Sequence, residues 1–227
     1  MVREIVFDTE TTGFYYDKGD RLIEIGAVEL INHIPTGKTY HQYINPEREV
    51  PEGAVRVHGL TYDFLKDFPT FDKIADEWLE FIGDAKLVAH NATFDMNFVN
   101  YELKQLSKQQ MNWDNCIDTL EIARSMFPGA RCSLDALCKR FEIDNSARTY
   151  HGALLDAELL AEVYLELLGG KEPSLLFNNK EEKKENSLSY NNKKIYREPR
   201  VFKVEENLDD LHNSFLDSKI KNPIWKL

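Results

Sequence analysis

Arg3-Glu4-Ile5-Val6-Phe7-Asp8-Thr9-Glu10-Thr11-Thr12-Gly13 combines a short apolar run with two acids and a closing glycine. The apolar run predicts a buried strand, which ends before Gly13. Side chains two positions apart on a strand point the same way, so we expect Asp8 and Glu10 to face one side of a sheet. Two carboxylates held that close repel each other unless a cation, such as a hard divalent metal, lies between them. A solvated strand end is the simpler explanation of this pair alone. Residues further along the chain are needed to distinguish it from a metal site.

Chain length, apolar runs and cysteine content indicate the number of domains and the cellular compartment. The 227 residues suffice for one domain of ordinary size plus an appendage. No early run is apolar enough for a signal peptide or a transmembrane helix, so we expect a soluble cytoplasmic protein without membrane contacts. The three cysteines, Cys116, Cys132 and Cys138, contain no Cys-x-x-Cys pair and are expected to be reduced thiols in the core.

The net charge of −11 is unevenly distributed. Residues 171–227 hold 12 Lys and Arg against 10 Asp and Glu, a net charge of +2. Residues 1–170 hold 16 against 29, a net charge of −13. A body this acidic argues against a protein that coats DNA, but not against a nuclease, because bound metal neutralises a carboxylate site locally.

The order of apolar patterns predicts an α/β fold. Strands over residues 21–31 and 39–44 would form an antiparallel meander with the first strand. Pro46 and Pro51 bracket a segment that we expect to be irregular. Helices are then predicted over 70–82, after the N-cap Asn91, and over 133–141 and 151–168. A short strand is predicted at 86–89, and residues 116–122 are expected to begin as a strand and pass into a short helix. Together these elements predict a mixed five-stranded sheet, antiparallel at first and parallel later, flanked by helices.

The composition changes beyond Gly170. Residues 178–200 are rich in Asn, Lys and Glu and poor in apolar residues, so we predict a flexible linker over 171–200 after a domain over 1–170. Two apolar groups interrupt this tail, one within 172–177 and one within 201–227. Apolar groups on a tether usually bind a partner, although a tail that folds back on its own domain is the alternative.

Three distant residues change the interpretation of Asp8 and Glu10. Asp95 falls at a helix start after a predicted core strand, where the helix dipole alone would favour an acid. His151 also precedes a helix, and Asp156 lies one turn inside it among leucines, where an acid is costly unless it is paired or binds metal. Four acids and one histidine at the ends of core elements suit a two-metal phosphoryl-transfer site in which histidine takes a proton from water.

The same residues carry a family resemblance. Asp8-x-Glu10, Asn91-x-x-Phe94-Asp95 and His151-x4-Asp156 resemble the three exonuclease motifs of the DEDD superfamily, in its histidine subclass. Residues 23–29, 131–138 and 142–157 extend this likeness to the epsilon subunits of bacterial DNA polymerase III. The resemblance implies an RNase H-like fold and 3′→5′ removal of nucleotides from DNA as nucleoside 5′-monophosphates. It also implies that the four acids bind two Mg²⁺ or Mn²⁺ ions and that His151 is the general base.

Further roles follow from the resemblance alone. Val57-His58-Gly59-Leu60-Thr61 matches a segment whose histidine approaches the terminal nucleotide, so His58 is expected to bind substrate. The family's glutamate five residues earlier falls on Gly53, and Glu52 would replace it only by a shift of one position. The whole expected substrate-binding set is Asp8, Glu10, Thr11, Glu52, His58, Asn91 and Asp156.

The tail implies partners. Glu172-Pro173-Ser174-Leu175-Leu176-Phe177 resembles a sliding-clamp-binding peptide, whose expected contacts are Glu172, Leu175, Leu176 and Phe177. Residues 201–227 occupy the place where epsilon subunits bind the polymerase alpha subunit, and the family also allows a small theta-like partner. A stand-alone DEDD exonuclease that trims RNA or single-stranded DNA, and a non-catalytic scaffold that tethers polymerase to clamp, are the alternatives. The extended tail argues against the first, and the complete acid set argues against the second.

Overall fold

The computed structural model describes residues 1–146, 148, 150–170, 211, 214–215 and 218. The chain divides into two units, Met1–Phe177 and Asn178–Leu227. The predicted linker 171–200, with its clamp-binding peptide, lies outside the described residues. In the second unit, the side chains of Leu211 and Phe215 are exposed.

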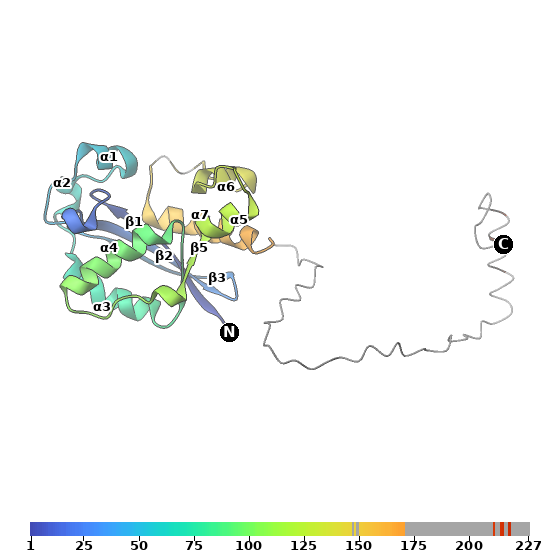
Figure 1. Ribbon diagram of the computed structural model, residues 1–227, viewed down its shortest axis with the longest axis horizontal. Helices are drawn as coiled ribbons and strands as arrows, with labels where there is room; N and C mark the ends of the chain where they lie inside the picture. The colour runs from blue at the N-terminus through green and yellow to red at the C-terminus, as the bar shows by residue number, and fades with distance from the viewer. Residues whose placement is uncertain (147, 149, 171–210, 212–213, 216–217, 219–227) are drawn as a thin grey trace. The chain divides into compact units, whose positions relative to one another are not determined.

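A mixed five-stranded sheet forms the centre of the first unit, as predicted (Figure 1). Its spatial order is β3-β2-β1-β4-β5. Strand β1 pairs with β2, and β2 with β3, in antiparallel fashion, whereas β4 is parallel to both β1 and β5. The strands are β1 (Arg3–Thr11), β2 (Leu22–Ile31), β3 (Ile34–Tyr43), β4 (Lys86–Ala89) and β5 (Cys116–Asp118).

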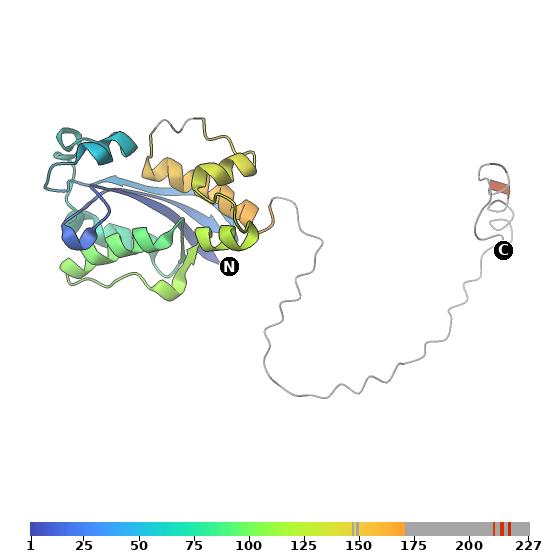
Figure 2. The ribbon, with the colours of Figure 1, turned by 45° about the horizontal axis from the view of Figure 1, so that its top comes forward.

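Helices lie on both faces of the sheet. Figure 2 shows α3 and α4 on one side and α6 and α7 on the other. The helices are α1 (Glu52–His58), α2 (Tyr62–Leu65), α3 (Phe71–Ile82), α4 (Ala92–Gln105), α5 (Thr119–Met126), α6 (Leu134–Arg140) and α7 (Ala153–Leu167), with short 3₁₀ turns η1 (Tyr16–Lys18) and η2 (Trp113–Asn115).

One local prediction was wrong and another was confirmed. The segment after Pro46 and Pro51 is not irregular throughout, because α1 and α2 form within it. Helix α1 starts directly after Pro51, its N-cap residue, which takes an extended conformation. Asn91 is the N-cap residue of α4, as predicted, although its side chain makes no capping hydrogen bond. It takes a left-handed conformation (φ 65°), which asparagine tolerates better than most residues.

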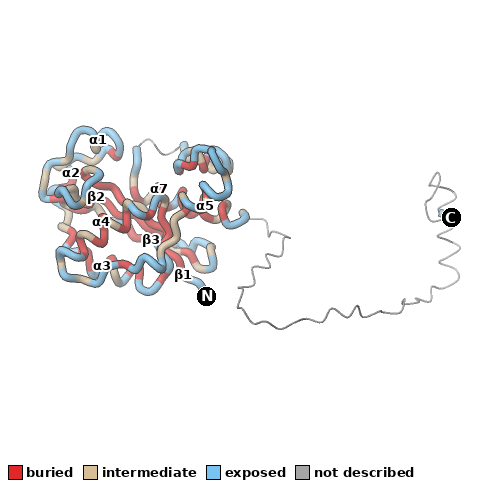
Figure 3. The backbone as a smooth tube through the Cα atoms, in the orientation of Figure 1, coloured by how far each residue is buried: buried red, intermediate tan, exposed pale blue. Residues whose placement is uncertain are grey.

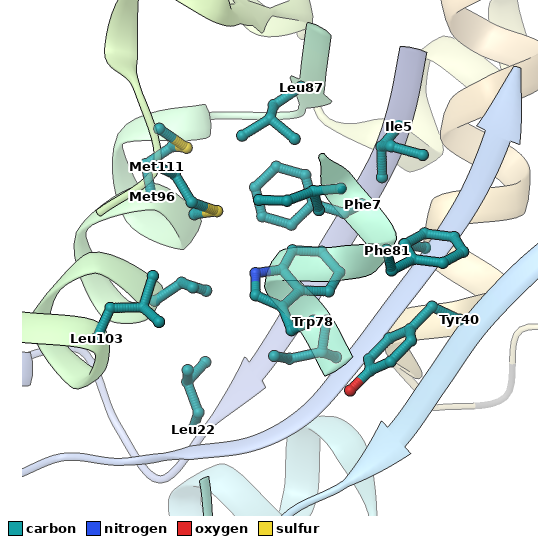
Figure 4. Close-up of a cluster of buried hydrophobic side chains, with 14 of the residues drawn as sticks. Ile5, Phe7, Leu22, Tyr40, Trp78, Phe81, Leu87, Met96, Leu103 and Met111 are labelled. Atoms are coloured by element: carbon teal, nitrogen blue, oxygen red, sulfur yellow. The ribbon is translucent and has the colours of Figure 1, made fainter. Parts of the chain in front are cut away.

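Alternation along β1 separates two cores. Ile5 and Phe7 face the side of α3 and α4, where they pack with Trp78 and other large apolar side chains (Figure 4). Val6 faces the side of α7 and packs with residues such as Leu160. Figure 3 shows the buried residues concentrated in the central strands and the helix faces against them. This alternation places Asp8 and Glu10, at even positions, on the α7 side of the sheet.

The described helices include none that is long and apolar enough to cross a bilayer. Cys116, Cys132 and Cys138 are free thiols, and the last two are buried, as expected of reduced core cysteines.

Candidate active site

Five predicted site residues meet at one end of β1. Asp8 and Glu10 come from that strand, Asp95 from the first turn of α4, and Asp156 from the first turn of α7. His151 lies two residues before α7. All five line one cavity of about 410 Å³, to which Asn91, His90, Phe94, Asp135 and Arg148 also contribute. Residues separated by almost 150 positions in the sequence therefore share one cavity.

Asp95 reaches this cavity from the opposite face of the sheet. It is buried, and its carboxylate accepts a hydrogen bond of 2.7 Å from the hydroxyl of Thr9. Thr9 lies between Asp8 and Glu10 and faces the other way, so β1 supplies carboxylates on one side and a donor for Asp95 on the other. The site thus draws acids from both helical layers.

Burial and mutual repulsion disfavour the charged forms of three of these acids. Burial, Asp95 and Glu10 raise the pKa of Asp8 well above its usual value. Burial, followed by the charges of Asp156 and Glu24, raises the pKa of Glu10 to about 8. Burial is the main cause that raises the pKa of Asp95 to about 7, against the hydrogen bond from Thr9. The cavity therefore favours the binding of positive charge.

Asp156 behaves differently because it has partners. Arg148 donates to both of its oxygens, from Nε at 2.5 Å and from Nη2 at 2.7 Å, and Nδ1 of His151 lies 3.3 Å from Oδ2. Burial alone would raise the pKa of Asp156, but the neighbouring His151 and Arg148 side chains outweigh it, so the pKa is lowered. His151 keeps a side-chain exposure of 45 % and is open to solvent.

The donor set fits divalent metal. Glu10, His151 and Asp156 offer ligand atoms that all lie within 4.8 Å of one another. Asp8 and Asp95 line the same cavity, and burial, the largest cause, raises the pKa values of both. Hard divalent cations prefer such oxygen ligands and neutralise clustered carboxylates.

A second cavity, of about 530 Å³, adjoins the first. Glu10 and Phe14 line both, and Thr11, Gly53 and His58 line the second. His58 is buried, and its Nδ1 accepts a hydrogen bond from the backbone N–H of Leu60, so the neutral ring carries its proton on Nε2. Burial lowers the pKa of His58. The neutral ring of His58 therefore lies in the wall of this second cavity, with its Nε2–H buried.

Other expected site residues lie elsewhere. Glu52 lines neither cavity: its side chain is 94 % exposed and lies 3.8 Å from Arg56. Gly53, where the family register places a glutamate, does line the second cavity. The expected clamp contacts Glu172, Leu175, Leu176 and Phe177 lie outside the described residues. A larger cavity of about 580 Å³, between η1, α3 and α4, contains none of the predicted site residues.

Three residues that shape the site were not predicted from the sequence. Arg148 pairs with Asp156, and Thr9 pairs with Asp95. Asp118, at the end of β5, accepts a hydrogen bond from the backbone N–H of Asn91 and raises the pKa of Asp95. Arg148 stands three positions before the motif histidine, which is the only signal in the sequence that could have identified it.

The chain matches a known protein family and several curated relatives. The Exonuclease (RNase_T) family model matches residues 5–164. The chain is 48 % identical over 225 residues to the DNA polymerase III subunit epsilon of Rickettsia felis, a match that covers 97 % of this chain and 98 % of that one. It is 50 % identical over 179 residues to the DNA polymerase III subunit epsilon of Escherichia coli, covering 75 % of this chain and 73 % of that one.

Solved structures agree on the fold. The nuclease domain of 3′hExo, a DEDDh family member bound to rAMP, is 18 % identical with a TM-score of 0.64, over 73 % of this chain and 91 % of that one. Exonuclease X in complex with 5′ overhanging duplex DNA is 24 % identical with a TM-score of 0.57, over 74 % of this chain and 91 % of that one. The predicted family and RNase H-like fold are confirmed: the chain belongs to the exonuclease family, and within it is a 3′→5′ exonuclease of the DNA polymerase III epsilon group.

Proposed function

We propose that the chain is the proofreading subunit of a bacterial replicative DNA polymerase and removes mismatched 3′-terminal nucleotides as nucleoside 5′-monophosphates. The observation that carries this proposal is the convergence of Asp8, Glu10, Asp95, Asp156 and His151 on one cavity. A scaffold without activity would have no need of buried acids with raised pKa values, which cost stability.

Each site residue has a role in this mechanism. Asp8, Glu10, Asp95 and Asp156 would hold two divalent cations, Mg²⁺ or Mn²⁺, which when bound polarise the phosphodiester and stabilise the attacking and leaving oxygens. His151 takes the proton of the attacking water. If its Nδ1 proton is donated to Asp156 Oδ2, 3.3 Å away, Nε2 is free to accept that proton.

The second cavity suits the terminal nucleotide. The exposed ring of Phe14 and the side chain of Phe94 provide surfaces on which a base can stack. His58 supplies an N–H donor, and Thr11, whose hydroxyl already donates to the Gly13 carbonyl, lines the same wall. Contacts of this kind accept any base, so selectivity for a mismatch would come from the ease with which an unpaired end frays.

The tail supplies the partners. Residues 172–177 would bind the sliding clamp, and residues 201–227 the polymerase alpha subunit, with a theta-like subunit as a further partner of the complex. An apolar anchor on a tether docks well into a preformed pocket. The protein would then act in the bacterial cytoplasm, at the primer end.

The proposal predicts metal-dependent release of mononucleotides. With a labelled primer that carries a mismatched 3′ end, we expect release with Mg²⁺ or Mn²⁺ and none with EDTA, because the four acids cannot bind the phosphodiester without cations. Chromatography of the released label identifies the product. Release that survives chelation would contradict the metal mechanism, and faster release from an RNA strand than from DNA would favour a stand-alone RNA-trimming enzyme.

A truncation separates catalysis from assembly. A chain of residues 1–170 should retain the exonuclease rate on a free primer and should no longer co-purify with the polymerase alpha subunit. Replacing Leu175, Leu176 and Phe177 by alanine is the matched control, which should weaken clamp binding and leave polymerase binding intact. Co-purification of the truncated chain would show that the tail is not the tether.

A further inference from the structure

Arg148 is an enclosed cation inside the acidic cavity. Its side chain is only 7 % exposed, and it comes from the segment between α6 and α7. Besides its two bonds to Asp156, it donates from Nη1 to Asp135 at 2.6 Å, and its Nη2 lies 2.7 Å from Nδ1 of His151. Its charge offsets part of the rise that burial and the neighbouring acids cause in the pKa values of Asp8 and Glu10. One guanidinium thus contacts the acid and the histidine of the third motif together.

The paired geometry at Asp156 conflicts with metal binding. Arg148 engages both carboxylate oxygens as a planar fork, which is the strongest form of such a pair. A cation bound to either oxygen would lie beside the guanidinium, and two positive charges at that separation in a partly buried site repel strongly. Arg148 and a divalent cation therefore compete for Asp156.

The contact with His151 has a second consequence. A guanidinium nitrogen can only donate, so Nδ1 of His151 must accept the hydrogen bond from Arg148. The neutral ring then carries its proton on Nε2, which has no lone pair left for the proton of a water molecule. His151 becomes a competent base only when Arg148 withdraws and Nδ1–H turns to Asp156.

We propose that Arg148 is a positioning residue that holds Asp156 and His151 in a non-catalytic arrangement and releases both when a divalent cation binds at Asp156. Asp135, whose side chain is 59 % exposed at the cavity wall, offers the guanidinium a partner outside the cluster of motif acids. The release couples metal binding to the tautomer of the base. The inference rests on the metal site of the proposed function and deepens it.

Metal affinity tests this competition directly. Mn²⁺ binding to the full chain, measured by electron paramagnetic resonance of the free ion, should be about tenfold tighter for Arg148→Gln than for the parent, the size expected when one charge-assisted pair is lost. Arg140→Gln is the matched control, because it removes the same charge from an exposed site on α6, where the guanidinium lies over Phe127. It should bind Mn²⁺ like the parent.

The outcomes separate the two proposals. If the parent binds Mn²⁺ and Arg148→Gln binds it equally or more weakly, the competition is overturned and the proposed function stands. If neither protein binds Mn²⁺, the metal mechanism is overturned, and the competition with it.

A second measurement reads the proton position in the parent chain itself and uses a variant only for assignment. The ¹⁵N resonances of His151, assigned by their loss in His151→Gln, report which ring nitrogen carries the proton at a pH about two units above the ordinary histidine value. With EDTA we expect the proton on Nε2, and with Mg²⁺ we expect it on Nδ1. A tautomer that Mg²⁺ leaves unchanged, or a proton on Nδ1 in both conditions, overturns the proposal.

Discussion

An Asp8→Asn chain should release mononucleotides at least about a thousandfold more slowly than the parent, because a metal that stabilises transition-state charge is worth several kcal/mol. Asp8 lines the cavity between the other acids, and an amide oxygen is a much weaker ligand for a hard cation than a carboxylate. The amide has nearly the same shape, so the fold should persist. Single-turnover cleavage of the mismatched primer measures the loss.

The same substitution should stabilise the metal-free protein. The folded pKa of Asp8 is raised above its unfolded value, so the folded state holds a proton that the unfolded state has lost, and stability falls as pH rises above the unfolded pKa. Asparagine has no proton to lose. With EDTA, Asp8→Asn should therefore melt above the parent at about pH 8 and close to it at about pH 4, near the unfolded value.

The control for Asp8→Asn is Asp84→Asn, which removes an acid from an exposed turn after α3. It should change neither the cleavage rate nor the melting temperature. If Asp8→Asn cleaves the primer at the parental rate, Asp8 is not a ligand of the metal site. A lower melting temperature in EDTA at about pH 8 would mean that its carboxylate is stabilised rather than strained in the fold.

Local patterns explain which elements the sequence predicted well. Helix α3 and strand β4 match their predicted ranges to within a residue, because the apolar stripe of α3 ends at Gly83 and β4 is a short apolar run. Helices α1 and α2 were missed because they are short and carry few buried residues. His58 is the one buried side chain of α1, and Leu65 that of α2. Tertiary contacts, rather than their own periodicity, hold them in place.

The site residues that belong to short sequence motifs could be predicted from the sequence. Asp8, Glu10, Asp95, His151 and Asp156 each belong to a short pattern that marks the end of a core element. Thr9 and Arg148 belong to no such pattern, because their importance lies in contacts with residues from other elements. The 86 positions between Thr9 and Asp95 show why: only the fold brings these two side chains to 2.7 Å.

Gly26 explains how α7 comes close enough to β1 to complete the site. It lies on β2 directly opposite Asp8 and on the face that α7 covers. A Cβ atom at this position would lie 2.1 Å from the backbone nitrogen of Leu154 and 2.2 Å from the carbonyl carbon of Ala153. These are backbone atoms of the first turn of α7, so no side-chain rotation can relieve the overlap. Only a glycine lets this turn rest on the sheet.

Gly26→Ala should therefore lower the free energy of unfolding by about 3 kcal/mol, at the upper end of what overpacking usually costs. It should also slow cleavage at temperatures where the protein remains folded. The first turn of α7 carries Asp156 and follows His151, and a displacement of about 1 Å in a catalytic group can cost about a hundredfold in rate. Denaturant unfolding and single-turnover cleavage at low temperature measure the two effects.

Gly53→Ala provides the matched control for stability, because an added Cβ there meets no atom within 4 Å and Gly53 lies in the first turn of α1, where alanine is favoured. It should unfold at the same or a slightly higher denaturant concentration than the parent. If Gly26→Ala unfolds at the same denaturant concentration as Gly53→Ala, α7 does not rest on the backbone of β2. If Gly26→Ala is destabilised but cleaves at the parental rate, the helix moves without displacing Asp156, and the close packing serves the core rather than the chemistry.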